Sequence, residues 1–524
     1  MKTFESINIV KDNKEQLRNC FLFFFFIAIC GYISLIVSFC PYSDDAHRYV
    51  TNLSVGELGS LRSNTFLLEL FAYLSTVITD TAPFSHIISC LFLAYSATIC
   101  LKIFDVDLNN KWEVLCFAPV IINPYMLEVM MYRFDNSFIT FAFMLSITSV
   151  YLSSSNNKRW LFAQVALLLL CLFTYQPALF VYFIAFTYFF INELSLGQKF
   201  VTIISKMRYW FLTLAITAIC YVPFALSLRY SKVEGKSLFV IPTNIKNIRI
   251  ITDNIIQYFS KLYVDWSENI AGQIFFFMFI IFALNMIFRT AVKTRSVSSI
   301  LLVAIYTFIF TLCPIGTCLL LRTLVYEGNE AIVRIMYSVG LLISLVLFSN
   351  HSLFKKNKGS DIFHNFLISI FVIWNMVFLN SAANIIQYFR ELQQHVFYDI
   401  SKDIFDITNK DQNIKKICIT GTVETQAMSN FFKLYPIMNR IIPEQWNIPD
   451  YCRIALINPQ FSKQILTNAP ICEEYIESEY SNKKLIKSHM MYNIFSLDHV
   501  LLLIELKKNI KIKRAADTIA TIRK

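Results

Sequence analysis

The chain has 524 residues, of which 56% are hydrophobic, 16% aromatic and only 16% charged, and its formal net charge is +11. A soluble protein of this length carries more charge. The low charge and the mean hydropathy of +0.52 together exclude an ordinary water-soluble enzyme. The excess Lys and Arg lie in short alternating loops rather than on one clustered face, which argues against nucleic acid as a partner.

The first hydrophobic run, at about 20–40, follows a basic N-terminal segment that is predicted to be cytoplasmic. The next stretch, Pro41–Tyr49, reads PYSDDAHRY and places two adjacent carboxylates, Asp44 and Asp45, beside the membrane surface. Arg48 follows one helical turn later. A helix that leaves the bilayer often meets Ser and Asp simply as a cap for the next helix, so the acidic pair has a structural interpretation beside a functional one.

Further hydrophobic runs bring the predicted total to about eleven spans, or about nine if 160–194 is one re-entrant hairpin. This number places every Lys/Arg cluster of a short loop on the cytoplasmic side, and those loops carry hardly anything but Lys, Arg and polar spacers. A polar loop is predicted at 229–270. The runs lie at about 85–104, 113–131, 136–154, 160–194 (two short helices), 210–228, 271–288, 298–320, 332–349 and 362–380.

Three segments depart from a simple spanning helix. The run at 113–131 contains Pro119 and Pro124, and the run at 160–194 is broken at Tyr175-Gln176-Pro177. Irregular backbone at such depth is tolerated only where it is packed in protein or lines a cavity, so both should be buried in the bundle. Residues 64–79 repeat apolar side chains at helical spacing and predict an interfacial helix.

These observations predict an all-α polytopic membrane protein with about 9–11 transmembrane helices and a small C-terminal α/β periplasmic domain. Its parts would be a cytoplasmic N-terminus (1–19), a transmembrane domain (20–380) with an acidic first periplasmic loop (41–84), and the C-terminal domain (381–524). Short apolar runs separated by turn residues predict strands in that last part. If it lies outside, one pair among its cysteines, such as Cys452 with Cys472, could form a disulfide.

Charged and hydrogen-bonding residues gather at the predicted outer ends of the spans. Each alone has a structural interpretation as a helix pair or cap. Together they suit a lipid-linked phosphosugar, because arginine binds phosphate through a rigid donor fork and a carboxylate can accept the proton of an attacking hydroxyl. No metal or other cofactor is required, although the sequence leaves a divalent cation open. The residues are Asp44, Asp45, Arg48, Arg62, Glu128, Tyr132, Arg133, Asp135, Tyr175, Gln176 and Arg334.

The order and spacing of several short motifs resemble the phage-type O-antigen glucosyltransferases of the Gtr serotype-conversion group, which belong to the GT-C glycosyltransferases. The resemblance covers roughly residues 20–200. It rests on Tyr42-Ser43-Asp44-Asp45 with Arg48, Arg62 before an amphipathic helix, Asn123-Pro124-Tyr125, Glu128, Tyr132-Arg133-Phe134-Asp135 and Tyr175-Gln176-Pro177. Arg334 is a looser match. Arg62 departs from the usual pattern, because the family more often has a glycine next to this arginine, whereas here the sequence is Gly59-Ser60-Leu61-Arg62.

The resemblance implies a GT-C-like, polyprenyl-phosphate-sugar-dependent hexosyltransferase in the bacterial inner membrane. It would move glucose from undecaprenyl-phosphate glucose to a sugar of the lipid-linked O-antigen repeat on the periplasmic face, which changes the serotype, with a small flippase and a donor synthase as partners. Asp44 or Asp45 would act as base, and Arg133 and Arg334 would bind the phosphate. Asp135, Tyr175 and Gln176 would shape the sugar pocket.

Two other functions remain open from the sequence. An O-antigen polymerase or ligase is also polytopic, but it typically places its key residues in large central outer loops. A lipid-sugar flippase or transporter would carry charged groups at mid-span and polar residues that reach the cytoplasmic side. The acceptor sugar, the hydroxyl, the linkage and the choice between Asp44 and Asp45 also stay open.

Overall fold

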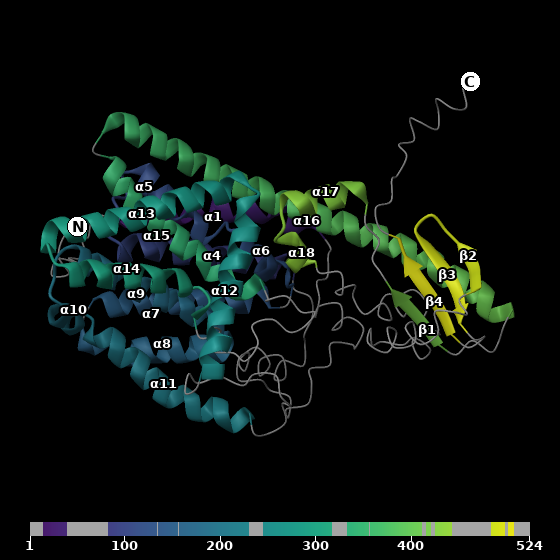
Figure 1. Cartoon of the computed structure of the whole chain (residues 1–524), viewed down its shortest axis with the longest axis horizontal. Helices are drawn as coiled ribbons and strands as arrows, with labels where there is room; N and C mark the ends of the chain where they lie inside the picture. Colours follow the sequence, from purple (N-terminus) through teal and green to yellow (C-terminus); the bar gives the residue numbers. More distant parts are fainter. Residues whose placement is uncertain are drawn as a thin grey trace. The chain divides into compact units, whose positions relative to one another are not determined.

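A computed structural model divides the chain into two compact units, and the boundary along the chain falls between Ser381 and Ala382 (Figure 1). The first unit is a helical bundle, and the second combines helix with a small sheet. The predicted helix at 64–79 and the cysteines Cys452 and Cys472 lie outside the described residues. These are 14–38, 82–133, 135–155, 157–229, 245–316, 333–355, 357–410, 416–420, 425–442, 484–497 and 501–507.

Each predicted span coincides with a helix or a broken helix, so the polytopic helical fold class is confirmed. Seven helices in the described part are long and apolar enough to cross a membrane, or up to nine if each of two bent pairs is one span, which is the lower end of the prediction. The helices of the bundle are α1 (Lys14–Val37), α4 (Phe84–Ile103), α5 (Lys111–Leu115), α6 (Pro124–Met131), α7 (Asn136–Ser154), α8 (Leu161–Thr174), α9 (Leu179–Ser195), α10 (Phe200–Lys206), α11 (Arg208–Arg229), α12 (Ile245–Ser267), α13 (Ile270–Thr294), α14 (Val297–Leu312), α15 (Val339–Phe354) and the start of α16 (Lys358–Lys410).

The helix predicted at 113–131 is bent by 53° between α5 and α6. Pro119 and Pro124 cause the bend, because proline has no N–H to continue the helical ladder. Asn123 restarts the helix, since its side-chain oxygen accepts hydrogen bonds from the backbone amides of Tyr125 and Met126, both at 3.1 Å. Every residue of α6 is buried, as expected for irregular backbone inside a membrane bundle.

The break at Tyr175 is also present, and it separates α8 from α9 by a short 3₁₀ turn, η6 (Gln176–Ala178). The break lies inside the bundle, some distance from the end at which α7 begins. Tyr175 and Phe143 both contact the ring of Tyr337, with centroids 6.1 and 5.5 Å away. Phe143 is seven residues from the start of α7, which at 1.5 Å per residue is about 10 Å along that helix.

The prediction of a polar loop at 229–270 is wrong for residues 245–267, which form helix α12 (Ile245–Ser267). Its buried residues recur every three or four positions, so the helix packs one face on the bundle while its other face stays polar. Tyr258 donates a hydrogen bond to the carbonyl of Thr311 in α14, at 2.8 Å. The buried residues of α12 are Asn254, Tyr258, Leu262, Asp265 and Trp266.

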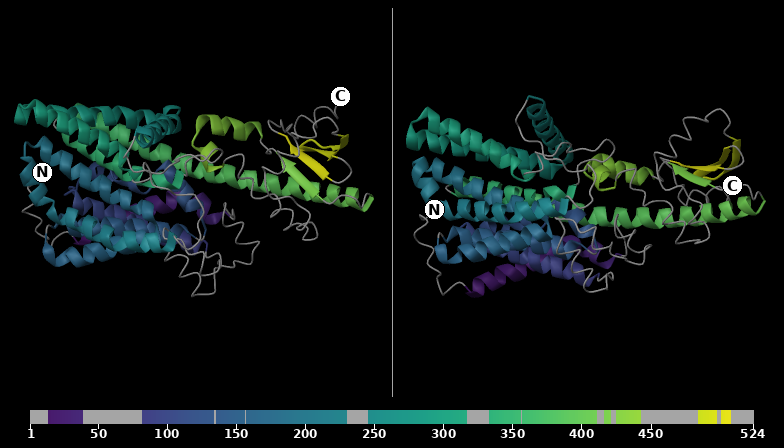
Figure 2. Two further views of the ribbon diagram at one scale, coloured as in Figure 1. Left: turned by 60° about the horizontal axis from the view of Figure 1, so that its bottom comes forward. Right: turned by 90° about the horizontal axis from the view of Figure 1, so that it is seen from below.

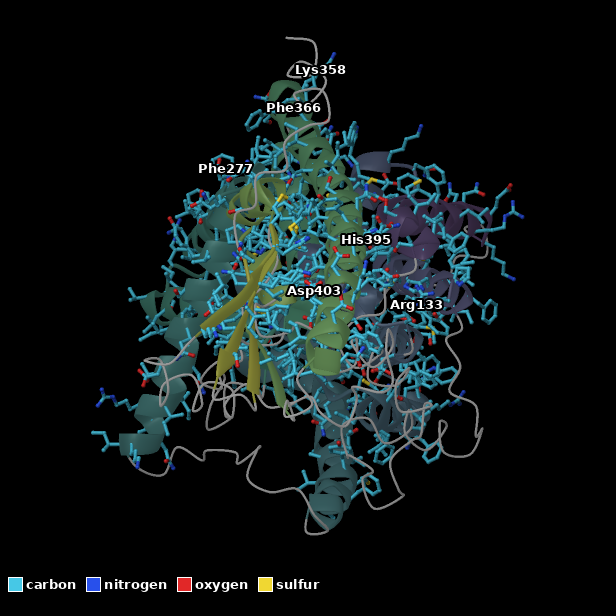
Figure 3. The ribbon with its side chains drawn as sticks, turned by 90° about the vertical axis from the view of Figure 1, so that its right-hand side faces the viewer. Arg133, Phe277, Lys358, Phe366, His395 and Asp403 are labelled. Atoms are coloured by element: carbon cyan, nitrogen blue, oxygen red, sulfur yellow. The ribbon has the colours of Figure 1, made fainter. Side chains whose placement is uncertain are left out.

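Helix α16 does not end at 380 as predicted but continues to Lys410, which gives it a total length of 53 residues. Apolar side chains project from the outside of the bundle, where lipid would cover them. Phe277 of α13 and Phe366 of α16 are two of these, with 47% and 59% of their surface exposed (Figure 3).

The second unit packs a four-stranded sheet along the C-terminal part of α16 (Figure 2). The strand order is β1-β4-β3-β2, with β1 parallel to β4 and the other pairs antiparallel. Phe397 and Ile400 of α16 share an apolar core with the sheet. Asp403 accepts hydrogen bonds from Tyr492 and Lys487 at its edge. The elements are β1 (Lys416–Thr420), α17 (Gln426–Leu434), α18 (Met438–Ile441), β2 (Lys484–Ser488), β3 (Tyr492–Leu497) and β4 (Leu501–Leu506).

Candidate active site

Seven of the eleven residues predicted for the site lie in the described part of the chain. They are Glu128, Tyr132, Arg133, Asp135, Tyr175, Gln176 and Arg334. The other four, Asp44, Asp45, Arg48 and Arg62, lie outside it. The described residues therefore belong to the part of the predicted site that would bind the donor. The role of Asp44 or Asp45 as base stays a prediction.

The end of α6 joins a distant segment, the 3₁₀ helix η8 (Val333–Ser338). Glu128 is buried, and its Oε2 accepts a hydrogen bond of 2.5 Å from the backbone amide of Arg334. One turn further on, the Tyr132 ring lies under the guanidinium group, with 4.7 Å between the Arg334 Cζ and the ring centroid. A cation over an aromatic face is attracted by the negative ring centre. The backbone and side chain of Arg334 are thus both positioned by α6.

A second arginine follows Tyr132 in the turn between α6 and α7. Arg133 is 93% buried, and its carbonyl accepts a hydrogen bond of 3.0 Å from Ser85 Oγ at the start of α4. It lies among the purple and blue helices of the N-terminal half in Figure 3. Asp135 is the residue before α7 and is also buried. The starts of α4 and α7 and the end of α6 therefore meet at one end of the bundle.

The break between α8 and α9 reaches the same end through η8. Tyr175 contacts the ring of Tyr337, which is three residues from Arg334 and so lies on the same side of the 3₁₀ helix. Gln176 instead turns toward α11, where its amide donates to the hydroxyl of Tyr221. The structure brings Glu128, Tyr132 and Arg334 into direct contact, and it joins Tyr175 to them through Tyr337.

One buried carboxylate of this region, Asp265, was not predicted from the sequence. Asp265 of α12 accepts a hydrogen bond of 2.8 Å from the hydroxyl of Tyr125, which itself accepts one of 3.0 Å from Trp266 Nε1. The bonds fasten α12 to α6, three residues before Glu128. A buried ionisable residue in a membrane bundle is by default a functional candidate. The apolar spacing of 245–267 was the signal that could have revealed this helix.

Another buried polar cluster lies at the other end of the bundle, between α5 and the end of α15. Glu113 Oε1 accepts hydrogen bonds from Lys355 Nζ at 3.0 Å and from the side chain of Asn110 at 3.2 Å. His351 lies 3.9 Å from the same oxygen and contacts His364 of α16, 3.4 Å away between their Nδ1 atoms. The sequence analysis predicted that the loops at this end carry hardly anything but Lys, Arg and polar spacers. The buried cluster of Glu113, His351 and Lys355 shows that this prediction is wrong.

The Glu113 hydrogen bond raises the pKa of Lys355 above its ordinary value. Lys355 follows the last residue of α15 and is about half exposed. The ammonium and the carboxylate therefore satisfy each other directly at this end of the bundle.

A comparison with known protein families assigns the chain to a class of enzyme. The family described as Glucosyl transferase GtrII matches residues 33–347, more than half of the chain. The chain belongs to the GtrII glucosyl transferase family. No curated protein and no solved structure gives a significant match.

Membership of the GtrII family confirms the resemblance drawn from the sequence motifs. With its membrane-spanning helices, the chain is a membrane glucosyltransferase that uses a sugar donor and an acceptor. All eleven predicted site residues and Asp265 fall inside the matched segment. The sheet of the second unit, which begins at Lys416, falls outside it.

Proposed function

We propose that this GtrII member transfers glucose from undecaprenyl-phosphate glucose to a sugar of the lipid-linked O-antigen repeat, on the periplasmic face of the bacterial inner membrane. The observation that carries the proposal is the pairing of Arg334 with Glu128 and Tyr132, at the end of the bundle that also holds Arg133. Two guanidinium groups at one end of a buried bundle suit an anionic lipid phosphate.

Phosphate binding by two arginines supplies what the leaving group needs. As the bond from the anomeric carbon to the phosphate oxygen breaks, negative charge grows on the polyprenyl phosphate. Positioned guanidinium groups stabilise that charge in a site from which water is largely excluded. The scheme needs no metal ion, since Arg133 and Arg334 do the neutralising.

The acceptor hydroxyl attacks the anomeric carbon from the side opposite the phosphate, so the configuration inverts in a single displacement. Asp44 or Asp45 takes the hydroxyl proton as the new C–O bond forms. Asp135 and Tyr175 line the sugar pocket, while Arg48 and Arg62 complete the basic lining. Gln176, which was also predicted for this pocket, bonds Tyr221 of α11 instead.

Glu128 and Tyr132 take a different role in this proposal from the direct substrate contact that the sequence suggested. Both act on Arg334, one through its backbone amide and the other beneath its guanidinium group. They are therefore positioning residues for the phosphate site.

The proposed topology places the N-terminus in the cytoplasm and the C-terminal domain in the periplasm. The donor would be made by a cytoplasmic synthase and delivered by a small flippase. The basic loops support this orientation, since Lys and Arg accumulate on the cytoplasmic side of short loops.

The proposal is tested with Asp44→Asn and Asp45→Asn in a host that carries the donor synthase and flippase. The readout is the mass of the O-antigen repeat, with membrane levels of each variant measured in parallel. We expect one variant to lose the added hexose at normal protein level. Asp253→Asn is the matched control, because Asp253 is an exposed carboxylate of α12 and should keep full activity.

Two outcomes contradict the proposal. If both aspartate variants add the hexose at the wild-type rate, the acidic pair is a helix cap and the mechanism is wrong. If the wild type adds no hexose but changes the chain length of the O-antigen, the chain acts in polymerisation.

A further inference from the structure

Two buried polar side chains near Arg334 make no hydrogen bond within the described chain. Both the amide oxygen and the amide nitrogen of Asn136 are without a partner, although the residue is fully buried. The hydroxyl of Tyr337 is in the same condition with 1% of its surface exposed. The large majority of buried polar side-chain atoms in proteins are hydrogen-bonded, so such atoms call for a missing partner.

Both residues adjoin the Arg334 pair on different sides. The backbone amide of Asn136 donates to the carbonyl of Tyr132, at 3.3 Å, and the Tyr132 ring lies under the Arg334 guanidinium. Tyr337 lies three residues after Arg334 in η8. Phe143, which contacts Tyr337, lies on the same face of α7 as Asn136 and about 10 Å further along that helix.

The chemistry of these groups selects the kind of partner. A primary amide offers an acceptor oxygen and donor hydrogens side by side, and a phenol offers one donor and one acceptor. Neighbouring hydroxyl groups of a hexose present the matching donors and acceptors. The aromatic faces of Tyr175 and Tyr337, whose ring centroids are 6.1 Å apart, supply the apolar surface that a sugar ring also needs.

We infer that Asn136 and Tyr337 form the subsite for the glucose ring of the donor, beside the phosphate site at Arg334. This inference rests on the proposed function, because it assigns the sugar half of the same lipid-phosphate glucose. When the donor is bound, hydroxyl groups of the hexose accept and donate the hydrogen bonds that the amide and the phenol lack without it. Arg334 and Arg133 hold the phosphate to which the anomeric carbon is attached.

The inference is tested by binding rather than by turnover. The full-length protein in lipid nanodiscs is titrated with a short-chain polyprenyl-phosphate glucose and, separately, with the same polyprenyl phosphate without sugar. The variant Asn136→Leu keeps the volume of the side chain but removes both polar atoms. We expect its Kd for the glucose-bearing lipid to rise roughly 10- to 100-fold while its Kd for the sugar-free lipid stays unchanged.

Tyr337→Phe is a second, milder variant, which keeps the ring contacts with Phe143 and Tyr175 and loses only the hydroxyl. Its Kd for the glucose-bearing lipid should rise about five- to tenfold. Thermal stability separates binding from folding. Replacing an unpaired buried amide by an apolar group of similar shape should leave the Tm of Asn136→Leu equal to or above that of the wild type.

Asn285→Leu is the matched control. Asn285 of α13 is buried and its amide nitrogen also lacks a partner among the described residues, but no contact links it to Arg334. Its replacement should leave both Kd values unchanged. Equal weakening by Asn285→Leu and Asn136→Leu would trace the effect to general packing and overturn the inference.

The remaining outcomes separate the inference from the proposed function. If the wild type prefers the glucose-bearing lipid and both Asn136→Leu and Tyr337→Phe retain that preference, the subsite is elsewhere and the donor assignment survives. An equal loss for both lipids would assign Asn136 to the phosphate instead and overturn the sugar subsite. If the wild type does not distinguish the two lipids, the proposed donor is wrong and the subsite fails with it.

Discussion

The two ends of the helical bundle each bury a glutamate close to a cation, but they connect the two charges differently. At one end, Glu113 bonds the Lys355 ammonium directly, so the two charges satisfy each other. At the other, Glu128 bonds the backbone amide of Arg334, and the guanidinium lies over the Tyr132 ring. The first arrangement closes a joint between helices. The second fixes the position of a cation by its backbone and by an aromatic face.

The two arrangements predict different consequences for substitutions at each end. An aromatic face holds a guanidinium in place while its in-plane N–H groups keep their directions. We expect the end with Glu113 to serve stability and the end with Glu128 to serve recognition of the phosphate. Four substitutions test this division.

The largest effect is expected at Arg334. Arg334→Lys keeps the charge but loses the planar fork and the stacking on Tyr132, so kcat/KM for glucosyl transfer should fall about 10²- to 10³-fold. The measurement is transfer from a short-chain donor, normalised to the amount of folded protein. Arg289→Lys is the control, because Arg289 bonds Ser352 at the other end and should retain activity within about twofold. A similar loss in both variants would remove the distinction between the ends.

Glu128→Gln should have the next largest effect. The amide oxygen can still accept from the Arg334 backbone, but a neutral acceptor forms a weaker bond than a carboxylate. We expect kcat/KM to fall roughly tenfold, since Arg334 is less firmly positioned, while the Tm changes by no more than about 2 °C. Wild-type kinetics in this variant would mean that Glu128 does not position the phosphate site.

The same substitution at the other end should reverse the pattern. Glu113→Gln removes the charge that bonds Lys355 and faces His351, so the free energy of unfolding should fall by about 1–3 kcal/mol. Thermal unfolding in detergent measures that loss. Transfer per folded molecule should stay within about twofold of the wild type. If activity fell further while the Tm was unchanged, this end would have a catalytic role.

The smallest effect concerns the pH dependence of the Glu113–Lys355 pair. Its hydrogen bond raises the pKa of Lys355 in the folded state, so the pair stabilises the protein fully below the unfolded pKa of about 10.4 and loses its effect as the pH rises through the folded value. Because Lys355 is half exposed, the contribution should be below about 1 kcal/mol. The Tm difference between wild type and Lys355→Met should be constant from pH 7 to about 9.5 and then shrink. A difference that grows above that pH contradicts the sign.

Local features of the sequence were enough to predict that the proline-containing run at 113–131 is buried and that the run at 160–194 is broken at Tyr175. Proline removes a backbone donor wherever it occurs, so its effect needs no knowledge of the rest of the chain. The length of α16 was open to the same reasoning. Its only glycine is Gly359 and it contains no proline, so nothing near residue 380 ends the helix.

Contacts between distant segments could not be predicted in this way. Asp265 was hidden because α12 is too polar to resemble a span, although its apolar residues repeat at helical spacing. The pairing of Glu128 with Arg334 depends on how α15 packs on the bend between α5 and α6. Gly340 permits that packing, since a Cβ there would lie 2.2 Å from the carbonyl oxygen of Pro119.

The bond between Glu128 and Arg334 joins residues 206 positions apart, and this separation sets when the site can first exist during synthesis. At about 5–20 residues per second, the ribosome needs roughly 10–40 s to make the intervening chain. During that time α6 must be retained beside the growing bundle without the segment that completes the proposed phosphate site. We therefore expect a nascent chain cut short before residue 334 to insert helices into a membrane but not to form the proposed phosphate site.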